Sequence, residues 1–212
     1  MKRTLTRLTL AFALAGAPPA TTIAADGVYF GVSGGYVEYE DAEEQIDGAL
    51  ADQGLTPVGG LSIDDNDSGK KAYIGYWFNK YVGLEGGIID LGEVRASGAV
   101  TDGATNYTAT GTVASDGFTA SVLGRVPLHP RFSVFGKAGA YQWDTDFDLG
   151  NFSRSDDGTS GLLGIGGEFE LGRAGPLWHL RAEWEHFFDV GEKDTTGRSD
   201  IDYVSIGIVA YH

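Results

Sequence analysis

Apolar residues alternate with small or polar residues in several short runs of the chain. In the sequence LEGGI, Leu84 and Ile88 fall on one face of an extended chain and Glu85 falls on the other. A period of two residues is typical of a β-strand rather than a helix. An aromatic-rich run precedes this one, and the two meet at the polar pair Asn79-Lys80. We therefore predict a β-hairpin over residues 71–92, with strands of roughly the 9–11 residues that cross a bilayer obliquely.

The same period predicts eight strands in all. They begin at residue 27, occupy the two halves of the 71–92 hairpin, and then cover residues 118–128, 132–146, 160–171, 177–190 and 200–212. Long polar connections are expected at 38–67, 93–116 (which includes the flared tops of two strands), 148–158 and 191–199, and short ones at Asn79-Lys80, 129–131 and 172–176. This alternation is expected of an outer-membrane barrel, whose extracellular loops are long and whose periplasmic turns are short.

The strand at 177–190 distinguishes a membrane barrel from a soluble one, because a lipocalin-like carrier could also have eight strands. One face carries Trp178, Leu180, Ala182, Trp184 and Phe188, and the other carries His179, Arg181, Glu183 and Glu185. A charged interior contradicts an apolar ligand carrier but fits a small membrane barrel with its apolar face toward lipid. Trp at both ends fits the aromatic girdles of such barrels. The predicted fold class is all-β, an eight-stranded antiparallel transmembrane β-barrel with long extracellular loops and short periplasmic turns.

The first 25 residues have the features of an export signal. Lys2, Arg3 and Arg7 precede a short apolar core, and a cleavage site of small residues follows at Ala24 or Ala25. Residues 26–212 are then expected to form one barrel domain. They contain no Cys, so no disulfide supports the fold and no lipid anchor follows the signal. With the three basic signal residues removed, 12 basic residues face 30 acidic ones, which argues against nucleic acid as a partner.

Three segments carry a resemblance to a known family. The sequences GYWFNKYVGLEGG with DLG in 75–92, FGKAGAYQW in 135–143 and LRAEWEHFFDVG in 180–191 resemble parts of OmpA-type outer-membrane barrels. The resemblance covers nearly all of the expected mature chain and implies the outer membrane of a Gram-negative bacterium. Two departures are that the chain ends at His212, where such barrels usually end in an aromatic residue, and that we expect no peptidoglycan-binding domain.

Charged residues on the polar face of each strand are expected to point into the barrel. The resemblance matches Glu85, Lys137, Arg181 and Glu183 to the interior charge cluster that plugs such barrels, and Glu168 and Arg125 are expected to extend it. A narrow barrel holds little water to solvate a lone charge, so opposite charges must pair. Two interpretations remain open: purely structural pairs, or a gate in which exchange of partners opens a narrow water path.

Other chemistry is weakly supported by the sequence. The acidic stretch 38–67 could bind Ca²⁺ or bridge to lipopolysaccharide phosphates. Position 12 of a loop that starts at Asp64 is Gly75, however, and not the Glu of a Ca²⁺ loop, which favours a solvated loop. His186 is the one base expected near the outer membrane boundary, and no Ser follows at the offset used by lipid-modifying barrels. We predict no catalytic site, no cofactor and no metal cluster.

These patterns together predict an integral outer-membrane protein with a structural role in the envelope, at most a narrow gated pore with a charge-plugged lumen. The alternative is a surface adhesin or ligand-binding barrel that acts through its acidic extracellular loops. The expected partners are membrane lipid and lipopolysaccharide, the outer-membrane assembly machinery, and a host or surface ligand at the loops. No nucleic-acid partner is expected, and the protein is expected to be a monomer.

Overall fold

The computed structural model describes residues 27–40, 56–58, 62–64, 66–101, 106–149, 152–172, 177–191 and 199–212. Eight long strands form the fold: β1 (Gly27–Tyr39), β4 (Asn66–Trp77), β5 (Val82–Thr101), β6 (Asn106–His129), β7 (Phe132–Leu149), β8 (Phe152–Gly172), β9 (Leu177–Val190) and β10 (Ser199–Tyr211). Two short strands, β2 (Thr56–Pro57) and β3 (Ser62–Asp64), pair with the far end of β5. The predicted signal at residues 1–25 lies outside the described residues.

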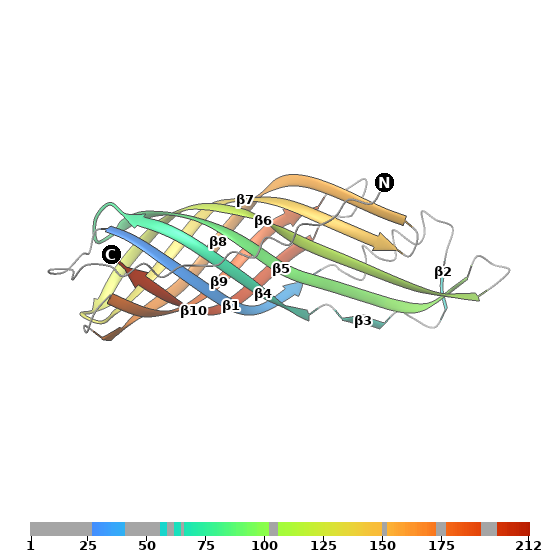
Figure 1. Cartoon of the computed structure of the whole chain (residues 1–212), viewed down its shortest axis with the longest axis horizontal. Helices are drawn as coiled ribbons and strands as arrows, with labels where there is room; N and C mark the ends of the chain where they lie inside the picture. Colours follow the sequence, from blue (N-terminus) through green and yellow to red (C-terminus); the bar gives the residue numbers. More distant parts are fainter. Residues whose placement is uncertain are drawn as a thin grey trace.

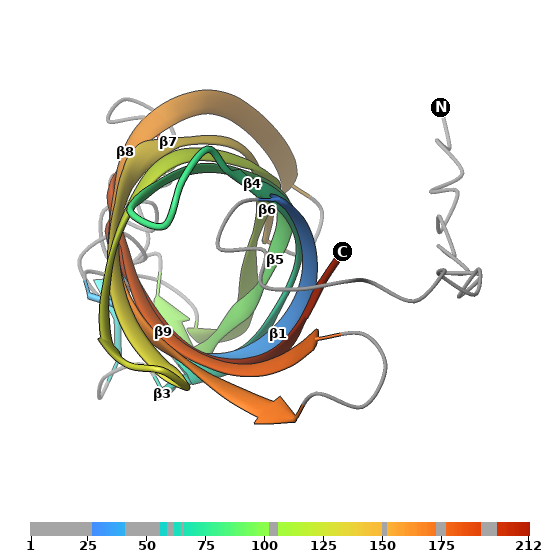
Figure 2. The same ribbon diagram turned by 90° about the vertical axis from the view of Figure 1, so that its left-hand side faces the viewer.

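The long strands close into a barrel (Figures 1 and 2). Neighbours along the chain pair antiparallel, and β1 pairs with β10 from Tyr29↔Tyr211 to Tyr39↔Ile201. Closure leaves the eight-stranded wall without an open edge, which satisfies the backbone hydrogen bonds inside a bilayer. The predicted fold class, an all-β antiparallel barrel of eight strands, is confirmed.

Side chains alternate between the inside and the outside of this wall. On β10, Tyr203, Ser205 and Val209 are buried, whereas Val204 and Ile206 between them are more than half exposed. Large exposed apolar side chains of this kind recur on all eight long strands and form the lipid-facing band. The described residues include no helix with the length and hydrophobicity to cross a membrane.

Several predicted connections prove to be strand. The polar loop expected at 148–158 is wrong, because β7 runs to Leu149 and β8 begins at Phe152, and these two residues pair. The stretch 93–116 does hold the tops of two strands, since β5 ends at Thr101 and β6 begins at Asn106. Outside the bilayer both faces of such a hairpin meet water, so hydrophobic alternation disappears although the backbone still pairs. Figure 1 shows β5 and β6 continuing well beyond the rest of the wall.

The first long connection also differs from its prediction. Within 38–67, β1 continues to Tyr39, β4 begins at Asn66, and β2 and β3 add further pairing, while the remainder lies outside the described residues. The turn expected as Asn79-Lys80 is a four-residue connection at 78–81. The side-chain oxygen of Asn79 accepts hydrogen bonds from the backbone N–H groups of the two residues that follow Lys80, at 2.8 and 3.0 Å.

Two glycines make room for two large interior side chains, Tyr29 and Tyr73. A Cβ on Gly75 would overlap the ring of Tyr29, and a Cβ on Gly31 would overlap the ring of Tyr73. These glycines stand opposite the tyrosines on β1 and β4, through the pairs Tyr29↔Gly75 and Gly31↔Tyr73. The interior of so narrow a barrel accepts a tyrosine on one strand because its partner has no side chain.

Candidate functional site: a charged layer inside the barrel

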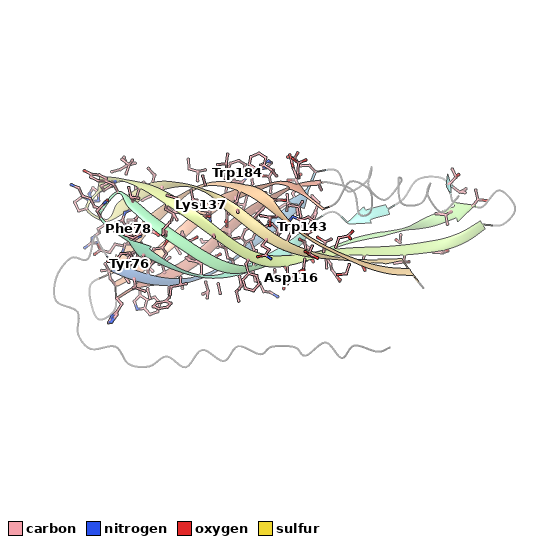
Figure 3. The ribbon with its side chains drawn as sticks, turned by 90° about the horizontal axis from the view of Figure 1, so that it is seen from above. Tyr76, Phe78, Asp116, Lys137, Trp143 and Trp184 are labelled. Atoms are coloured by element: carbon pink, nitrogen blue, oxygen red, sulfur yellow. The ribbon has the colours of Figure 1, made fainter. Side chains whose placement is uncertain are left out.

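A layer of ionisable side chains crosses the middle of the barrel interior. Alternation on β9 points Arg181, Glu183 and Glu185 inward, while Ala182 and Trp184 between them face outward. Four other strands each add one residue, namely Lys71 of β4, Glu85 of β5, Lys137 of β7 and Glu168 of β8. All seven side chains are at most 2% exposed. Figure 3 shows Lys137 midway along the wall, between Phe78 near one end and Asp116 toward the other.

Arg181 joins two carboxylates in this layer. Its Nε donates to Glu168 Oε1 at 2.8 Å, and its Nη1 donates to Glu85 Oε2. The guanidinium carbon lies 4.8 Å from the ring centroid of Tyr73 and 4.6 Å from that of Phe135. A planar guanidinium can bind two carboxylates and stack on aromatic rings at the same time, which a lysine cannot do. Arg181 therefore links the charged layer to the aromatic side chains beside it.

Two lysines hold the remaining carboxylates. Lys71 Nζ lies 2.8 Å from Glu185 Oε1 and 3.4 Å from Glu85 Oε1. Lys137 Nζ contacts Glu183 and Glu185 and lies 3.5 Å from Glu85 Oε1. Every carboxylate of the layer thus has a cationic partner, as charges away from water require.

Among the described residues, the layer contains three cations and four carboxylates. Hydroxyl groups compensate in part for the surplus negative charge. Tyr29 donates to Glu85 Oε2 at 2.9 Å, and Tyr211 donates to Glu168 Oε2 at 2.6 Å. His179 approaches the same carboxylate, with Nδ1 at 3.7 Å from Glu168 Oε2. Removal of any one cation would leave four buried carboxylates with two cations.

Apolar and aromatic layers close the barrel on both sides of the charges. The layer toward the short turns consists of Tyr29, Tyr73, Trp77, Leu123, Phe135, Val209 and Tyr211. The layer toward the opposite end consists of Val37, Tyr39, Ile89, Leu91, Tyr141, Trp143, Leu162, Phe187, Val190, Ile201 and Tyr203. Sequence alternation predicted a polar interior, but these two layers show that large apolar and aromatic side chains pack on either side of the charged layer. The described part of the lumen is a packed core.

Five of the six residues predicted for the interior network lie together in the charged layer: Glu85, Lys137, Glu168, Arg181 and Glu183. The sixth, Arg125, lies closer to the short turns, with its guanidinium carbon 4.1 Å from the ring centroid of Trp77 and its Nε donating to the Lys80 carbonyl at 3.2 Å. These contacts place Arg125 beside the aromatic layer at that end.

Lys71 and Glu185 belong to the layer but were not predicted for it. Glu185 shares the inward face of β9, so the alternation already contained the signal. Lys71 follows another lysine, and the sequence KK leaves open which of the two points inward. The structure shows that Lys71 is buried on the same inward face of β4 as Tyr73 and Trp77, whereas Lys70 is exposed.

Comparison with known proteins identifies the type of barrel. The sequence profile of the OmpA-like transmembrane domain matches residues 23–212. Outer membrane protein A of Serratia marcescens is 25% identical over 213 residues, which cover 96% of this chain and 55% of that protein. Outer membrane protein A of Yersinia pseudotuberculosis is 27% identical over 161 residues, covering 69% of this chain and 42% of that protein. The chain thus spans about half the length of the curated relatives it matches.

A solved structure shows the same fold at low sequence identity. The crystal structure of Neisserial surface protein A superposes with a TM-score of 0.54 at 12% identity, covering 88% of this chain and 97% of that one. At this identity the likeness shows an outer-membrane β-barrel architecture. It agrees with the profile match and with the resemblance of the three segments noted in the sequence.

Proposed function

Because the chain belongs to the OmpA-like transmembrane domain family, and is accordingly an outer-membrane protein, we propose that its role is structural. In this proposal the barrel is a stable membrane element of the envelope whose lumen is closed in its ground state. The observation that carries the proposal is the charged layer packed between two aromatic layers, with all seven ionisable side chains at most 2% exposed.

The packing supports a closed state more than an open pore. A water path would have to pass both aromatic layers and also separate Arg181 or Lys137 from their carboxylates. Removing one partner of a buried pair costs about 3–5 kcal/mol, so opening needs an exchange of partners instead of simple separation. Glu85, which contacts Arg181, Lys71 and Lys137, is the residue at which such an exchange would take place.

The proposal includes a monomer inserted by the outer-membrane assembly machinery, in contact with membrane lipid and lipopolysaccharide. The closed wall supports the monomer, since β1 and β10 pair within one chain and leave no edge for a second copy to complete.

Envelope integrity in a deletion strain tests the structural role. Cells that lack the protein should take up more of an apolar fluorescent dye and become more sensitive to detergent. The wild-type gene should restore both properties, because the intact barrel supports the membrane. Unchanged uptake and sensitivity in the deletion strain would contradict the structural role.

A second candidate is binding of a surface ligand, which the extension of β5 and β6 beyond the membrane favours. Because Ser97 pairs directly with Thr110, replacing residues 98–109 by Asn-Gly gives a short hairpin that leaves the membrane barrel intact. If the role is structural, the shortened protein should still restore normal dye uptake and detergent sensitivity to the deletion strain. A ligand-binding protein would lose adhesion to surfaces while dye uptake stays normal. Acidic residues outnumber basic ones in the chain, which favours a cationic ligand.

A further inference from the structure

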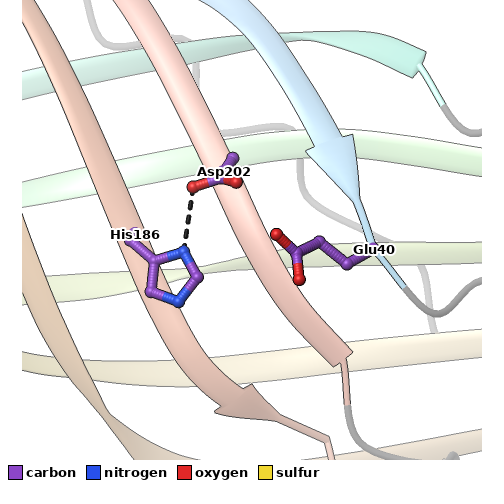
Figure 4. A group of neighbouring side chains, drawn as sticks. All are labelled: Glu40, His186 and Asp202. Atoms are coloured by element: carbon purple, nitrogen blue, oxygen red, sulfur yellow. Dashed lines mark hydrogen bonds and ion pairs between the residues drawn. The ribbon is translucent and has the colours of Figure 1, made fainter.

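Outside the lumen, three strands bring a histidine and carboxylates together on the outer surface of the barrel. Glu40 follows β1, His186 lies on β9, and Asp202 lies on β10. One ligand atom from each of these residues lies within 4.8 Å of the others. Figure 4 shows the three side chains converging across the neighbouring strands. The lumen network does not include any of them.

Hydrogen bonds orient two of these side chains. The Asp202 Oδ1 atom accepts from Trp184 Nε1 at 3.0 Å and lies 2.9 Å from His186 Nδ1. The backbone N–H of Glu40 donates to the Asp200 carbonyl at 3.0 Å, which fixes the end of β1 against β10. A partner such as Trp184, which holds the side chain of a ligand from behind, is characteristic of metal sites.

Negative charge exceeds positive charge at this point. Asp200 adds a third carboxylate, with Oδ2 at 3.6 Å from His186 Nε2. One imidazole therefore stands among three carboxylates, an arrangement that a bound cation would stabilise.

We propose that Glu40, His186 and Asp202 bind a divalent transition-metal ion of the Zn²⁺ class, with Asp200 beside it. An imidazole nitrogen with carboxylate oxygens suits such ions, whereas Ca²⁺ and Mg²⁺ take oxygen ligands. The ligand atoms lie within 4.8 Å of one another, so an ion midway between any two of them would lie at most about 2.4 Å from each, against roughly 2.0–2.2 Å in zinc sites. Glu40 is exposed at the end of its strand, so a small side-chain rotation closes this gap.

The site lies just outside the lipid-facing band. The next outward-facing pair in the direction of the membrane is Trp184↔Val204, and both of these side chains are exposed and apolar. An ion held here would tie together β1, β9 and β10 at the seam where the chain closes on itself. The simpler alternative is a His–Asp hydrogen bond whose effect is to position Trp184.

Zn²⁺ binding to the refolded, tag-free barrel in detergent micelles tests the proposal. After treatment with EDTA and its removal, isothermal titration calorimetry should show one Zn²⁺ per barrel. His186→Asn should weaken binding about tenfold or more, the size of effect that changes around metal sites produce. His129→Asn is the matched control, because His129 is exposed at the last position of β6, at the other end of the barrel. This variant should bind Zn²⁺ as the wild type does.

A heat-dependent shift in gel mobility must first show that each variant is folded. Two results would overturn the proposal: no Zn²⁺ binding by the wild type, or equal binding by the wild type and the His186→Asn variant. Ca²⁺ or Mg²⁺ that displaces Zn²⁺ at equal concentration would overturn the assignment to a transition metal. If the simpler alternative holds, His186→Asn changes Trp184 fluorescence but the wild type binds no metal.

Discussion

At the scale of single residues, stability in the lumen depends on matched charges at positions that water does not reach. Lys71 contacts Glu185 and Glu85, and its side chain is fully buried. Arg181 stacks on aromatic rings while it binds two carboxylates. Substitution of either cation enlarges the surplus of buried carboxylates, so these positions should tolerate change much less than charged residues on the outer surface.

The two adjacent lysines of β4 make this prediction testable. Lys71→Ala should lower the free energy of unfolding by about 3 kcal/mol, because it leaves Glu185 and Glu85 short of a buried partner. Lys70→Ala should change it by less than about 0.5 kcal/mol, since Lys70 is exposed on the outer face. Urea unfolding in lipid vesicles, followed by tryptophan fluorescence, measures both. Equal effects of the two substitutions would refute the role given to the charged layer.

At the scale of elements, the strands continue past the membrane, and their registers mark where it ends. Strand pairing places four exposed aspartates side by side across β5 to β8, through the pairs Asp90↔Asp116, Asp116↔Asp144 and Asp144↔Asp157. The exposed apolar pair Ile88↔Phe118 lies two positions from this row, on the side of the short turns. Because a row of carboxylates cannot lie in lipid, the apolar band ends between these two rows.

Like charges directly opposite one another destabilise a pair of strands. Asp144 stands between Asp116 and Asp157, so Asp144→Asn should raise the free energy of unfolding by about 0.5 kcal/mol at low ionic strength. Salt screens exposed charges, and the gain should disappear near 1 M salt, where the Debye length is about 3 Å. The same urea titration at both salt concentrations checks this. A destabilised variant, or a gain that salt does not alter, would contradict the explanation.

The strands inside the membrane were predictable from sequence because each has one apolar face. Trp184 and Glu185 identify the outward and inward faces of β9 without any structure. The strands outside the membrane were not predictable: residues such as Asp156 and Asp157 meet water on both sides, so no alternation distinguishes strand from loop. The contacts of Arg125 with Trp77 and the Lys80 carbonyl depend on where the turn lies. The pattern around Asn79 predicted the boundaries of that turn only approximately.

At the scale of the whole molecule, the protein is a closed barrel with an extension of its strands at one end (Figures 1 and 2). Its interior contains a charged layer between two aromatic layers. The aromatic layers exclude water from the charges, and the charges hold β4, β5, β7, β8 and β9 to one another across the lumen. Because the outer face of the barrel meets lipid, this interior packing is what stabilises the wall. In the proposed closed state it also blocks the path that a pore would need.

The closed lumen is the central claim, and single-channel recording of the refolded barrel in a planar bilayer tests it most directly. The wild type should show no conductance steps. The Arg181→Ala variant, once a heat-dependent gel shift shows that it is folded, should show small discrete steps because both the charged layer and the adjoining aromatic contacts are broken. Regular steps in the wild type that do not change on replacement of Arg181 or Lys137 would contradict the claim.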